Sequence, residues 1–440
     1  MSESAKRQLW EAIENRRDEI YRIGDVVWQR PETGFREENT SRIAQETFGE
    51  LGLPYRSGLA VTGVRADWDS GKPGPRVAVF GELDSILLAS HPAADPTTGA
   101  VHACGHHAQF AAMLGCAMAF ADANVAQELC GSIAFIAVPA EEYLELEFRR
   151  GLAAAGKIEF LSGKSELIRI GALDDVDLAL MIHTGLRRAA HVPDSMNGFV
   201  AKDVVFRGRA AHAGLSPELG VNALRAAMLA VQAINAQRET FRDEDAIRVH
   251  EVINRGGDAL NVVPDHVQME TKVRAKSVHA VLDTARKVDR CLKAGALAVG
   301  GKVEIDTLTG YLPLISNPRL GEIFLANARP GAFGLDVTSG GHRGSSTDMG
   351  DVSHVMPAIH PHVGGGAGKF HGADFRIVDK QLAYLDSAKI LAGCLVDLLS
   401  DGAAEAKRIC RESPPAMTKA QFIDYMRENC THAQHDFTEE

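Results

Sequence analysis

Residues 101–109 read V-H-A-C-G-H-H-A-Q, and the rest of the chain is organised around this stretch. It places one cysteine and three histidines within six residues, and thiolates and imidazoles are ligands that transition metals accept. The apolar run Arg76–Phe80 precedes it, and the Ala- and Met-rich run Phe110–Phe120 follows it at helical spacing. Open α/β sheets place their binding sites at such strand–loop–helix junctions. By itself the cluster fits a buried cysteine with surface histidines as well as a metal site, so other parts of the chain must decide.

The length and composition describe a globular protein of about two domains. The chain has 440 residues, of which 45% are hydrophobic and 24% are charged. Its formal net charge of -11 argues against nucleic acid as the main partner, because nucleic-acid binding needs a basic face. We expect no membrane partner, since no apolar run approaches the roughly 20 residues that cross a membrane. Residues 1–30 lack the apolar core of a signal peptide, and the seven cysteines have no framework spacing, so we expect a reducing cytoplasm.

Three predicted strands lead into side chains that can bind a metal. The runs and the residues after them are 76–80 with Asp84, 131–138 with Glu141 and Glu142, and 177–182 with His183. Strands that alternate with helices predict a mainly parallel sheet, and its C-terminal edge would collect these side chains. We therefore expect an α/β catalytic domain with helices on both faces of a mainly parallel sheet.

The pattern changes near Asn197, where a compact α+β unit is inserted into this domain. Strands are predicted at 202–207, 247–253, 267–275 and 303–309, and helices at 220–237 and 278–298. The expected division is a catalytic domain at 1–196 and 310–400, an inserted domain at 197–309 and a C-terminal extension at 401–440. The extension is polar, and we expect it to be partly disordered or an appended helix. Residues 4–27 and 379–399 are each predicted to form one helix.

The chain can supply every part of a two-metal hydrolase site, which needs a bridging anion, further ligands and a base for the attacking water. Cys104 is a thiolate once it binds metal, and Glu142 is a second anionic ligand. The neutral ligands available are His106, His183 and His371. If Glu142 binds metal, the adjacent Glu141 points elsewhere and is available as the base. Paired glutamates at a strand end are also common as surface acids, so their meaning depends on the other ligands.

Nine short motifs follow one another along about residues 10–400. They are R-P-E-T-G-F at 30–35, G-E-L-D at 81–84, H-A-C-G-H at 102–106, P-A-E-E at 139–142, H-T at 183–184, A-H-A-G at 211–214, N-V-V-P at 261–264, S-T-D-M-G-D at 346–351 and H-G at 371–372. In this order they resemble the aminoacylase/carboxypeptidase-G superfamily of metal-dependent exopeptidases, peptidase family M20. The amidohydrolase subfamily, which includes aminobenzoyl-glutamate and indole-acetyl-amino-acid hydrolases, is the most similar.

The resemblance implies a metal-binding role for five residues. Cys104 bridges two divalent metal ions, and the other ligands are His106, Glu142, His183 and His371. Glu141 is the general base, which activates the water and then passes its proton to the leaving nitrogen. Asp84 does not bind metal itself but orients a residue that does.

The resemblance also implies a role for the inserted domain, as the dimerisation or lid domain of a homodimer or higher homo-oligomer. His212 reaches an active site, that of the partner subunit, and polarises the scissile carbonyl. Asn261 and Arg274 hold the carboxylate of a small-molecule substrate, for which a guanidinium is a suitable bidentate clamp.

His107 departs from the family pattern, which usually has Asp or Asn after C-G-H. An extra imidazole there could be a proton shuttle, a further ligand or a group packed behind the ligands, and we favour the last of these or no role. His342, His360 and His362 are likewise interpreted as histidines that lie at the surface or that contact the metal ligands without binding metal.

The leading functional prediction is a metal-dependent hydrolase that cleaves a C–N bond with metal-activated water. The amide of an N-acyl or aminobenzoyl amino acid is the expected substrate. Each protomer is expected to hold two ions, Mn or Zn first and Co or Ni next. One alternative is an aromatic aminohydrolase that deaminates an aminobenzoate such as 5-nitroanthranilate, for which His107 would be the place to look. Another is a non-catalytic binding homologue, which the complete set of ligands and the base disfavour.

Overall fold

The computed structural model describes residues 2–329 and 333–439, which form two units. The first unit contains Met1–Asp194, Ile315–Gly341 and Asp351–Lys419, and the second contains Ser195–Leu314, His342–Gly350 and Ala420–Glu440. Each unit has its own hydrophobic core.

The first unit is built on a six-stranded sheet with the order β1-β2-β6-β3-β7-β18. The strands are β1 (Tyr55–Leu59), β2 (Gly63–Asp69), β3 (Arg76–Glu82), β6 (Ser132–Val138), β7 (Leu178–Met181) and β18 (Ala358–Ile359). The last four are parallel, and β1 and β2 are antiparallel to their neighbours. The mainly parallel α/β sheet expected from the sequence is therefore confirmed. Every residue of β6 is buried, as its continuous apolar run predicts for a central strand.

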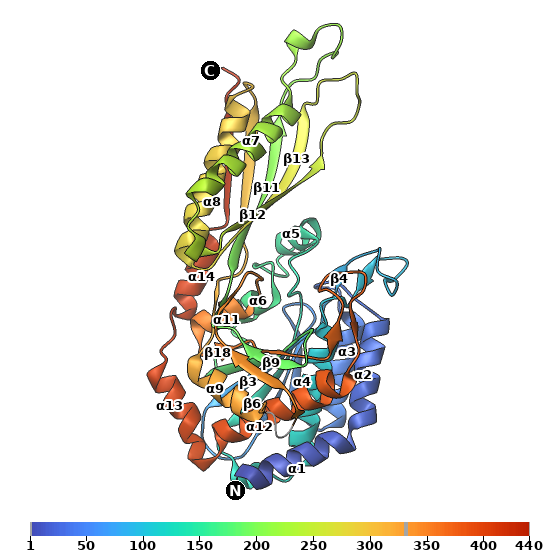
Figure 1. Cartoon of the computed structure of the whole chain (residues 1–440), viewed down its shortest axis with the longest axis vertical. Helices are drawn as coiled ribbons and strands as arrows, with labels where there is room; N and C mark the ends of the chain where they lie inside the picture. Colours follow the sequence, from blue (N-terminus) through green and yellow to red (C-terminus); the bar gives the residue numbers. More distant parts are fainter. Residues whose placement is uncertain (1, 330–332, 440) are drawn as a thin grey trace. The chain divides into compact units, whose positions relative to one another are not determined.

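Helix α4 (His106–Asp122) lies against β3 and is itself covered by α1, α2 and α12 (Figure 1). Its residues from His106 to Phe120 are all buried, which explains why the helix is apolar around its whole circumference. The other helices of this unit are α1 (Ser2–Asn15), α2 (Arg17–Gln29), α3 (Glu38–Glu50), α5 (Leu146–Ala154), α6 (Gly163–Arg169), α9 (Pro318–Asn327), α11 (Met349–Val355), α12 (Ser387–Leu399) and α13 (Ala404–Glu412).

Two predicted helices are wrong in detail. The helix predicted at 4–27 is broken at Arg16, whose backbone leaves the helical region at φ -96° and ψ 9°. The Arg16 guanidinium binds Asp122 at the end of α4, a tertiary contact that the local pattern does not contain. The helix predicted at 379–399 begins with a π-helical turn at Gln381–Asp386, where Ser387 Oγ donates to the Leu382 carbonyl.

Short strands complete the first unit beside the main sheet. The four-stranded sheet has the order β16-β9-β19-β8, and two further pairs are β4–β5 and β20–β21. These strands are β4 (Ile86–Leu87), β5 (Ala100–Val101), β8 (His183–Thr184), β9 (Ala189–Val192), β16 (Asp336–Ser339), β19 (His362–Val363), β20 (Gly366–Ala367) and β21 (Arg376–Ile377).

The second unit is a five-stranded antiparallel sheet with the order β12-β13-β11-β14-β22, against which α7 and α8 pack. Its elements are β10 (Ser195–Met196), β11 (Gly198–Arg207), α7 (Ala223–Gln237), β12 (Arg248–Arg255), β13 (His266–Ala275), α8 (Val278–Leu297), β14 (Lys302–Thr309), β17 (His342–Arg343), α14 (Lys419–Glu428) and β22 (Thr431–Asp436). All four strands and both helices predicted at 202–309 are found. The helices α13 and α14 agree with the appended helix expected within residues 401–440, whereas the strand β22 is a correction, because disorder or a helix was expected there.

Among the residues that the structure describes, no helix combines the length and the apolar character needed to cross a membrane.

A buried carboxyl group in the first unit predicts a pH dependence of stability. Glu37 is fully buried; it accepts hydrogen bonds from the Ala140 backbone N–H (2.7 Å) and from Thr62 Oγ1 (2.6 Å). Burial, and then the charge of Asp84, raise the pKa of Glu37 from 4.5 to about 8. The folded protein therefore keeps a proton that the unfolded chain loses between these pH values, so the free energy of unfolding falls as pH rises across this window.

Glu37→Gln cannot ionise and is expected to remove this contribution, up to about 1.4 kcal/mol per pH unit for one proton. Denaturant titrations at several pH values between 4.5 and 8 measure the difference in slope between variant and parent. Glu50→Gln, on the surface, serves as the control and should leave the slope unchanged. Parallel curves for Glu37→Gln and the parent would show that Glu37 is ionised in the folded state.

Candidate metal centre

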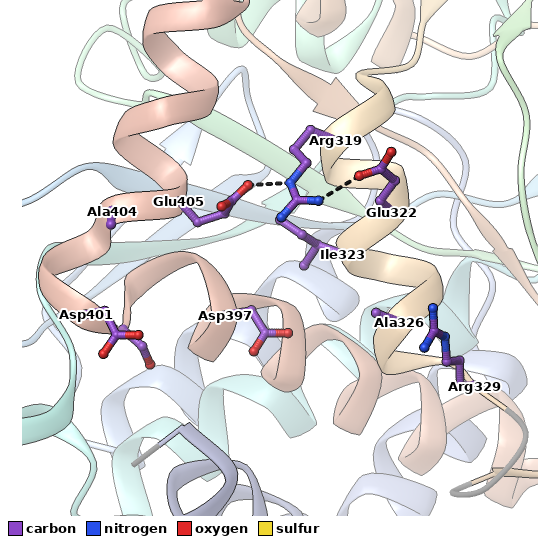
Figure 2. Close-up of a pocket in the computed structure, with 10 residues that line it drawn as sticks. Arg319, Glu322, Ile323, Ala326, Arg329, Asp397, Asp401, Ala404 and Glu405 are labelled. Atoms are coloured by element: carbon purple, nitrogen blue, oxygen red, sulfur yellow. Dashed lines mark hydrogen bonds and ion pairs between the residues drawn. The ribbon is translucent and has the colours of Figure 1, made fainter.

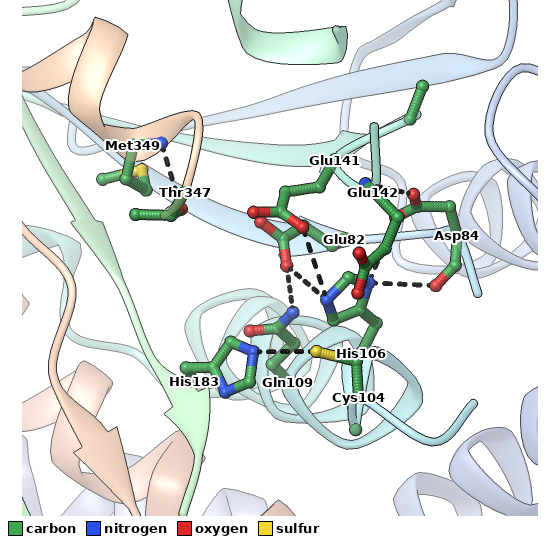
Figure 3. A network of polar contacts seen from close by, with 12 residues as sticks. Glu82, Asp84, Cys104, His106, Gln109, Glu141, Glu142, His183, Thr347 and Met349 are labelled. Carbon is green, nitrogen blue, oxygen red and sulfur yellow. Dashed lines mark hydrogen bonds and ion pairs between the residues drawn. The ribbon is translucent and has the colours of Figure 1, made fainter. Parts of the chain in front are cut away.

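Ionisable side chains meet at the C-terminal ends of β6, β3 and β7, which are neighbours in the sheet. Glu82 is the last residue of β3 and lies in register with Val138 of β6. Asp84 follows β3, Glu141 and Glu142 follow β6, and His183 follows β7. Because parallel strands end at one edge of a sheet, residues far apart in the chain are brought together, as Figure 3 shows.

His106, in the first turn of α4, is oriented by Asp84. Its Nδ1 donates to the Asp84 backbone carbonyl (3.0 Å) and to Asp84 Oδ1 (3.1 Å), which leaves Nε2 as the nitrogen with a lone pair. Asp84 Oδ2 accepts the backbone N–H of Glu142 at 2.7 Å. One carboxylate therefore aligns two of the predicted ligands, and Asp84 lies where a residue that orients a ligand is needed.

Gly105 permits this arrangement at the start of α4. Its φ is +92°, a left-handed conformation that glycine adopts readily. A Cβ at this position would lie 2.9 Å from the side chain of Thr184, directly beside His183.

Two groups of potential ligands share the sulfur of Cys104. The first is Cys104, His106 and His183, and the second is Cys104, Glu142 and His371; in each group the ligand atoms lie within 4.8 Å of one another. Cys104 Sγ is 3.5 Å from His183 Nε2, and His371 Nε2 is 3.1 Å from Glu142 Oε1. The five ligands predicted from the sequence are therefore brought together by the fold.

The donor atoms fit divalent cations. His183 Nδ1 donates to the Thr184 carbonyl at 2.9 Å, so the lone pair of its Nε2 faces the Cys104 sulfur. His106 Nε2 is buried without a hydrogen-bond partner among the described residues, yet it lies 3.1 Å from Glu82 Oε2. Lone pairs and carboxylates that converge repel one another unless a cation lies between them. Bonds of about 2.0–2.3 Å to one tetrahedral ion separate its ligand atoms by roughly 3.3–3.7 Å, close to the distances found.

The pKa shifts report the same convergence of charge. Burial alone would raise the pKa of the Cys104 thiol, but His106 and His183 lower it to about 6. Burial likewise lowers the pKa of His106, but the charges of Glu82 and Cys104 outweigh burial and raise it well above its ordinary value. Hydrogen bonding to Cys104 and Glu142 raises the pKa of His371 to about 10. The surroundings that raise the pKa of His106 and His371 therefore favour a positive charge at these rings, which a bound metal ion would also supply.

Glu141 faces this centre but belongs to neither group that shares Cys104. Its Oε2 lies 3.8 Å from His106 Nε2, and only 8% of the residue is exposed. A carboxylate that faces the centre from beside these two groups is placed as a general base requires.

Glu82 was not among the site residues predicted from the sequence, although it stands in the G-E-L-D motif. This residue is 1% exposed, and with His106 and Glu141 it forms a third group whose ligand atoms lie within 4.8 Å. The available signal was its position as the last residue of an apolar strand, the same signal that identified the residues after β6 and β7.

His107 lies away from the ligands, in a buried aromatic cluster. Its ring centroid is 5.0 Å from that of Trp28, 5.4 Å from that of His102 and 6.2 Å from that of Tyr384. Burial lowers the pKa of His107 to about 3, so the ring is neutral. None of the three ligand groups found among the described residues includes His107.

His360 and His362 are not surface residues. They follow β18 and stand in β19, and they are 1% and 8% exposed. Their rings stack at an interplanar angle of 15°, and each contacts the ring of His183, with centroids 5.5 and 5.3 Å apart. A fourth parallel strand therefore also ends in histidines at this edge.

The remaining predicted site residues belong to the second unit. His212 is exposed between β11 and α7, and its Nδ1 accepts backbone N–H groups of Gly214 (3.2 Å) and Leu215 (2.9 Å), so its Nε2 carries the proton. Asn261 is exposed in the loop before β13. Arg274, in β13, lies over the ring of Phe199 at 6.0 Å.

A pocket of about 530 Å³ elsewhere in the first unit has a different character (Figure 2). It is lined by residues of α9, α12 and α13, and its Arg319 binds Glu322 and Glu405. None of the ligands or Glu141 lines it, so it is separate from the metal centre.

Comparison with known proteins gives the class. Residues 196–299 match the family model described as a peptidase dimerisation domain. The chain is 30% identical to the Xaa-Arg dipeptidase of Mus musculus over 382 residues, 82% of this chain and 80% of that protein. It is 31% identical to the indole-3-acetyl-aspartic acid hydrolase of Enterobacter agglomerans over 304 residues, 64% of each chain. It is 32% identical to one of the subunits of the p-aminobenzoyl-glutamate hydrolase of Escherichia coli over 230 residues, 49% of this chain and 48% of that one.

Solved structures share the fold. A putative aminohydrolase from methicillin-resistant Staphylococcus aureus superposes with a TM-score of 0.73 at 22% identity, covering 90% of this chain and 100% of that one. The YXEP protein of Bacillus subtilis, described as a dinuclear metal binding peptidase, gives a TM-score of 0.65 at 20% identity, covering 88% and 99%.

The fold and the relatives define a metal-dependent hydrolase that acts on C–N bonds. The chain belongs to the M20 family of peptidases and amidohydrolases.

Proposed function

We propose that this protein hydrolyses the amide bond between an acyl group and an amino acid, in a centre that holds two divalent metal ions. The observation that carries the proposal is the pair of ligand groups that share the Cys104 sulfur, with Glu141 beside them. His106 and His183 would hold one ion, Glu142 and His371 would hold the other, and Cys104 would be shared by both. Mn and Zn are the first candidates, because this donor set accepts both.

The chain's own residues supply the proton transfers. Bound divalent ions polarise the scissile carbonyl and lower the pKa of water. Glu141 takes the proton of the attacking water and later gives it to the leaving nitrogen, so the amine departs neutral. Asp84 keeps His106 in the tautomer that presents Nε2 to the centre.

The second unit supplies substrate contacts in this proposal. Its match to a peptidase dimerisation domain supports a homodimer. His212 Nε2 would donate to the carbonyl oxygen in the partner's site, and Asn261 and Arg274 would bind the amino-acid carboxylate. In these terms residues 1–196 and 310–400 form the catalytic domain, 197–309 the dimerisation domain and 401–440 the extension. The cytoplasmic location expected from the cysteines stays a prediction.

An amide is favoured over an aminobenzoate because His107, the residue that pointed to aromatic deamination, packs away from the ligands. The relatives named above act, by their names, on dipeptides or on acylated amino acids. A dipeptide is itself an N-acyl amino acid, so these names share one chemical class.

A substrate panel tests the proposal. Protein loaded with Mn²⁺ or Zn²⁺ is incubated with aminobenzoyl-glutamate, indole-acetyl-aspartate, a dipeptide ending in arginine, and 5-nitroanthranilate. We expect release of the free amino acid from at least one of the first three, measured by chromatography, and none after chelation. Ammonia from 5-nitroanthranilate without amide cleavage would contradict the proposal and establish deamination.

A further inference from the structure

The buried pair Glu82–Lys164 adjoins the metal centre and has no part in the mechanism above. Lys164, in α6, donates its Nζ proton to Glu82 Oε1 at 2.6 Å, and both side chains are at most 1% exposed. Gln109 Nε2, in α4, donates to Glu82 Oε2. The carboxylate is therefore held from two sides by donors on different elements.

Stability alone does not account for this pair. The cost of removing two charges from water largely cancels their attraction, so a packed apolar pair would stabilise the fold as well or better. The fold instead places a fixed negative charge at the end of its central strand. This charge lies next to a predicted ligand atom. Glu82 Oε2 is 3.1 Å from His106 Nε2, the nitrogen whose lone pair faces the centre.

This 3.1 Å separation is close to the roughly 3.3–3.7 Å between two ligands of one tetrahedral ion. It equals the distance between His371 Nε2 and Glu142 Oε1 in the other ligand group. The group of Cys104, His106 and His183 offers three donors. Zn²⁺ in hydrolases keeps its fourth position for water or substrate and can expand to five ligands, which leaves one position for a further protein ligand.

We propose that Glu82 is a further protein ligand of the ion held by His106 and His183, and that Lys164 and Gln109 position its carboxylate. The inference rests on the proposed two-metal centre and extends its ligand set. The proposal gives the two ions different ligand sets, because Glu82 would bind the ion at His106 and would not contact the ion at His371.

Single-site backgrounds test this asymmetry by direct metal binding. His371→Ala leaves the His106 ion, and His183→Ala leaves the His371 ion. Each apoprotein is titrated with Co²⁺ by calorimetry and by the visible absorption spectrum, which reports the number of ligands. We expect Glu82→Gln to weaken Co²⁺ binding at least 10-fold in the His371→Ala background and to change its spectrum. In the His183→Ala background we expect less than about a twofold change.

Equal weakening in both backgrounds, or no weakening in either, would overturn the proposal. If the proposed two-metal centre is itself wrong, the parent protein with Glu82 unchanged will not bind two ions, so the two failures can be distinguished.

The double variant Glu82→Gln/Lys164→Met separates binding from folding. Lys164→Met alone leaves a buried charge without its partner and should lower the thermal midpoint, which the double variant should restore. Co²⁺ affinity should stay weak in the double variant, because the carboxylate is absent. Recovery of both stability and affinity would show that Glu82 has only a structural role. Lys202→Met serves as the matched control, since Lys202 is a buried lysine paired with Asp289 in the second unit.

Discussion

Glu141→Ala is expected to lower kcat/KM about 100- to 10,000-fold, the usual contribution of a general base, while both metal ions remain bound. The reason is geometric. Glu141 faces His106 Nε2 at 3.8 Å but stands outside both groups that share Cys104, so we expect the five proposed ligands to keep both ions after its removal. Turnover of the amide substrate and elemental analysis of the same sample make the measurement.

Glu141→Gln provides the isosteric comparison, because it keeps the volume of the side chain and removes its basicity. We expect both variants to be similarly inactive. Loss of a metal ion in either one would mean that Glu141 is a ligand, and retained turnover would mean that another group accepts the proton.

Cys104→Ala is expected to reduce the metal content from two ions to one or none and to abolish activity. Cys104 Sγ belongs to both ligand groups, so its removal weakens both ions together. The loss of affinity should exceed the roughly 10- to 100-fold that partners behind the ligands contribute. Stoichiometry by elemental analysis and affinity by calorimetry measure this effect.

Two comparisons make the Cys104 result specific. His183→Ala and His371→Ala each remove a ligand of one group only, so each should release a single ion. Cys116→Ala is the control, because Cys116 is a buried cysteine in α4 outside the ligand groups; we expect it to keep two ions. Unchanged stoichiometry in Cys104→Ala would exclude the sulfur as a bridge.

Local patterns in the chain were sufficient to predict the class of fold and most of the residues that the fold brings together at the candidate metal centre. Continuous apolar runs identify buried parallel strands, because a strand covered on both faces has no polar side. Parallel strands end at one edge, so Asp84, Glu142 and His183 could be assigned to one place without knowing the strand order. The motif around Cys104 and His106 is local, so it can be recognised from the sequence without knowledge of the fold.

Features that depend on contacts between distant segments became visible only in the folded chain. The fold placed β6 between β2 and β3, and it broke the first predicted helix at the residue that binds Asp122. It also paired the C-terminal strand β22 with β14, where the polar sequence gave no periodic signal.

The direction in which a side chain points is also not determined by the spacing of residues in the sequence. His106 and His107 are adjacent in the chain, yet one faces the ligands and the other packs against Trp28. Their different environments follow from the turn of α4, which rotates successive side chains by about 100°. The proposed role of Glu82 also depends on the fold. The donors that hold its carboxylate, Lys164 and Gln109, come from two helices that the sequence does not place beside β3.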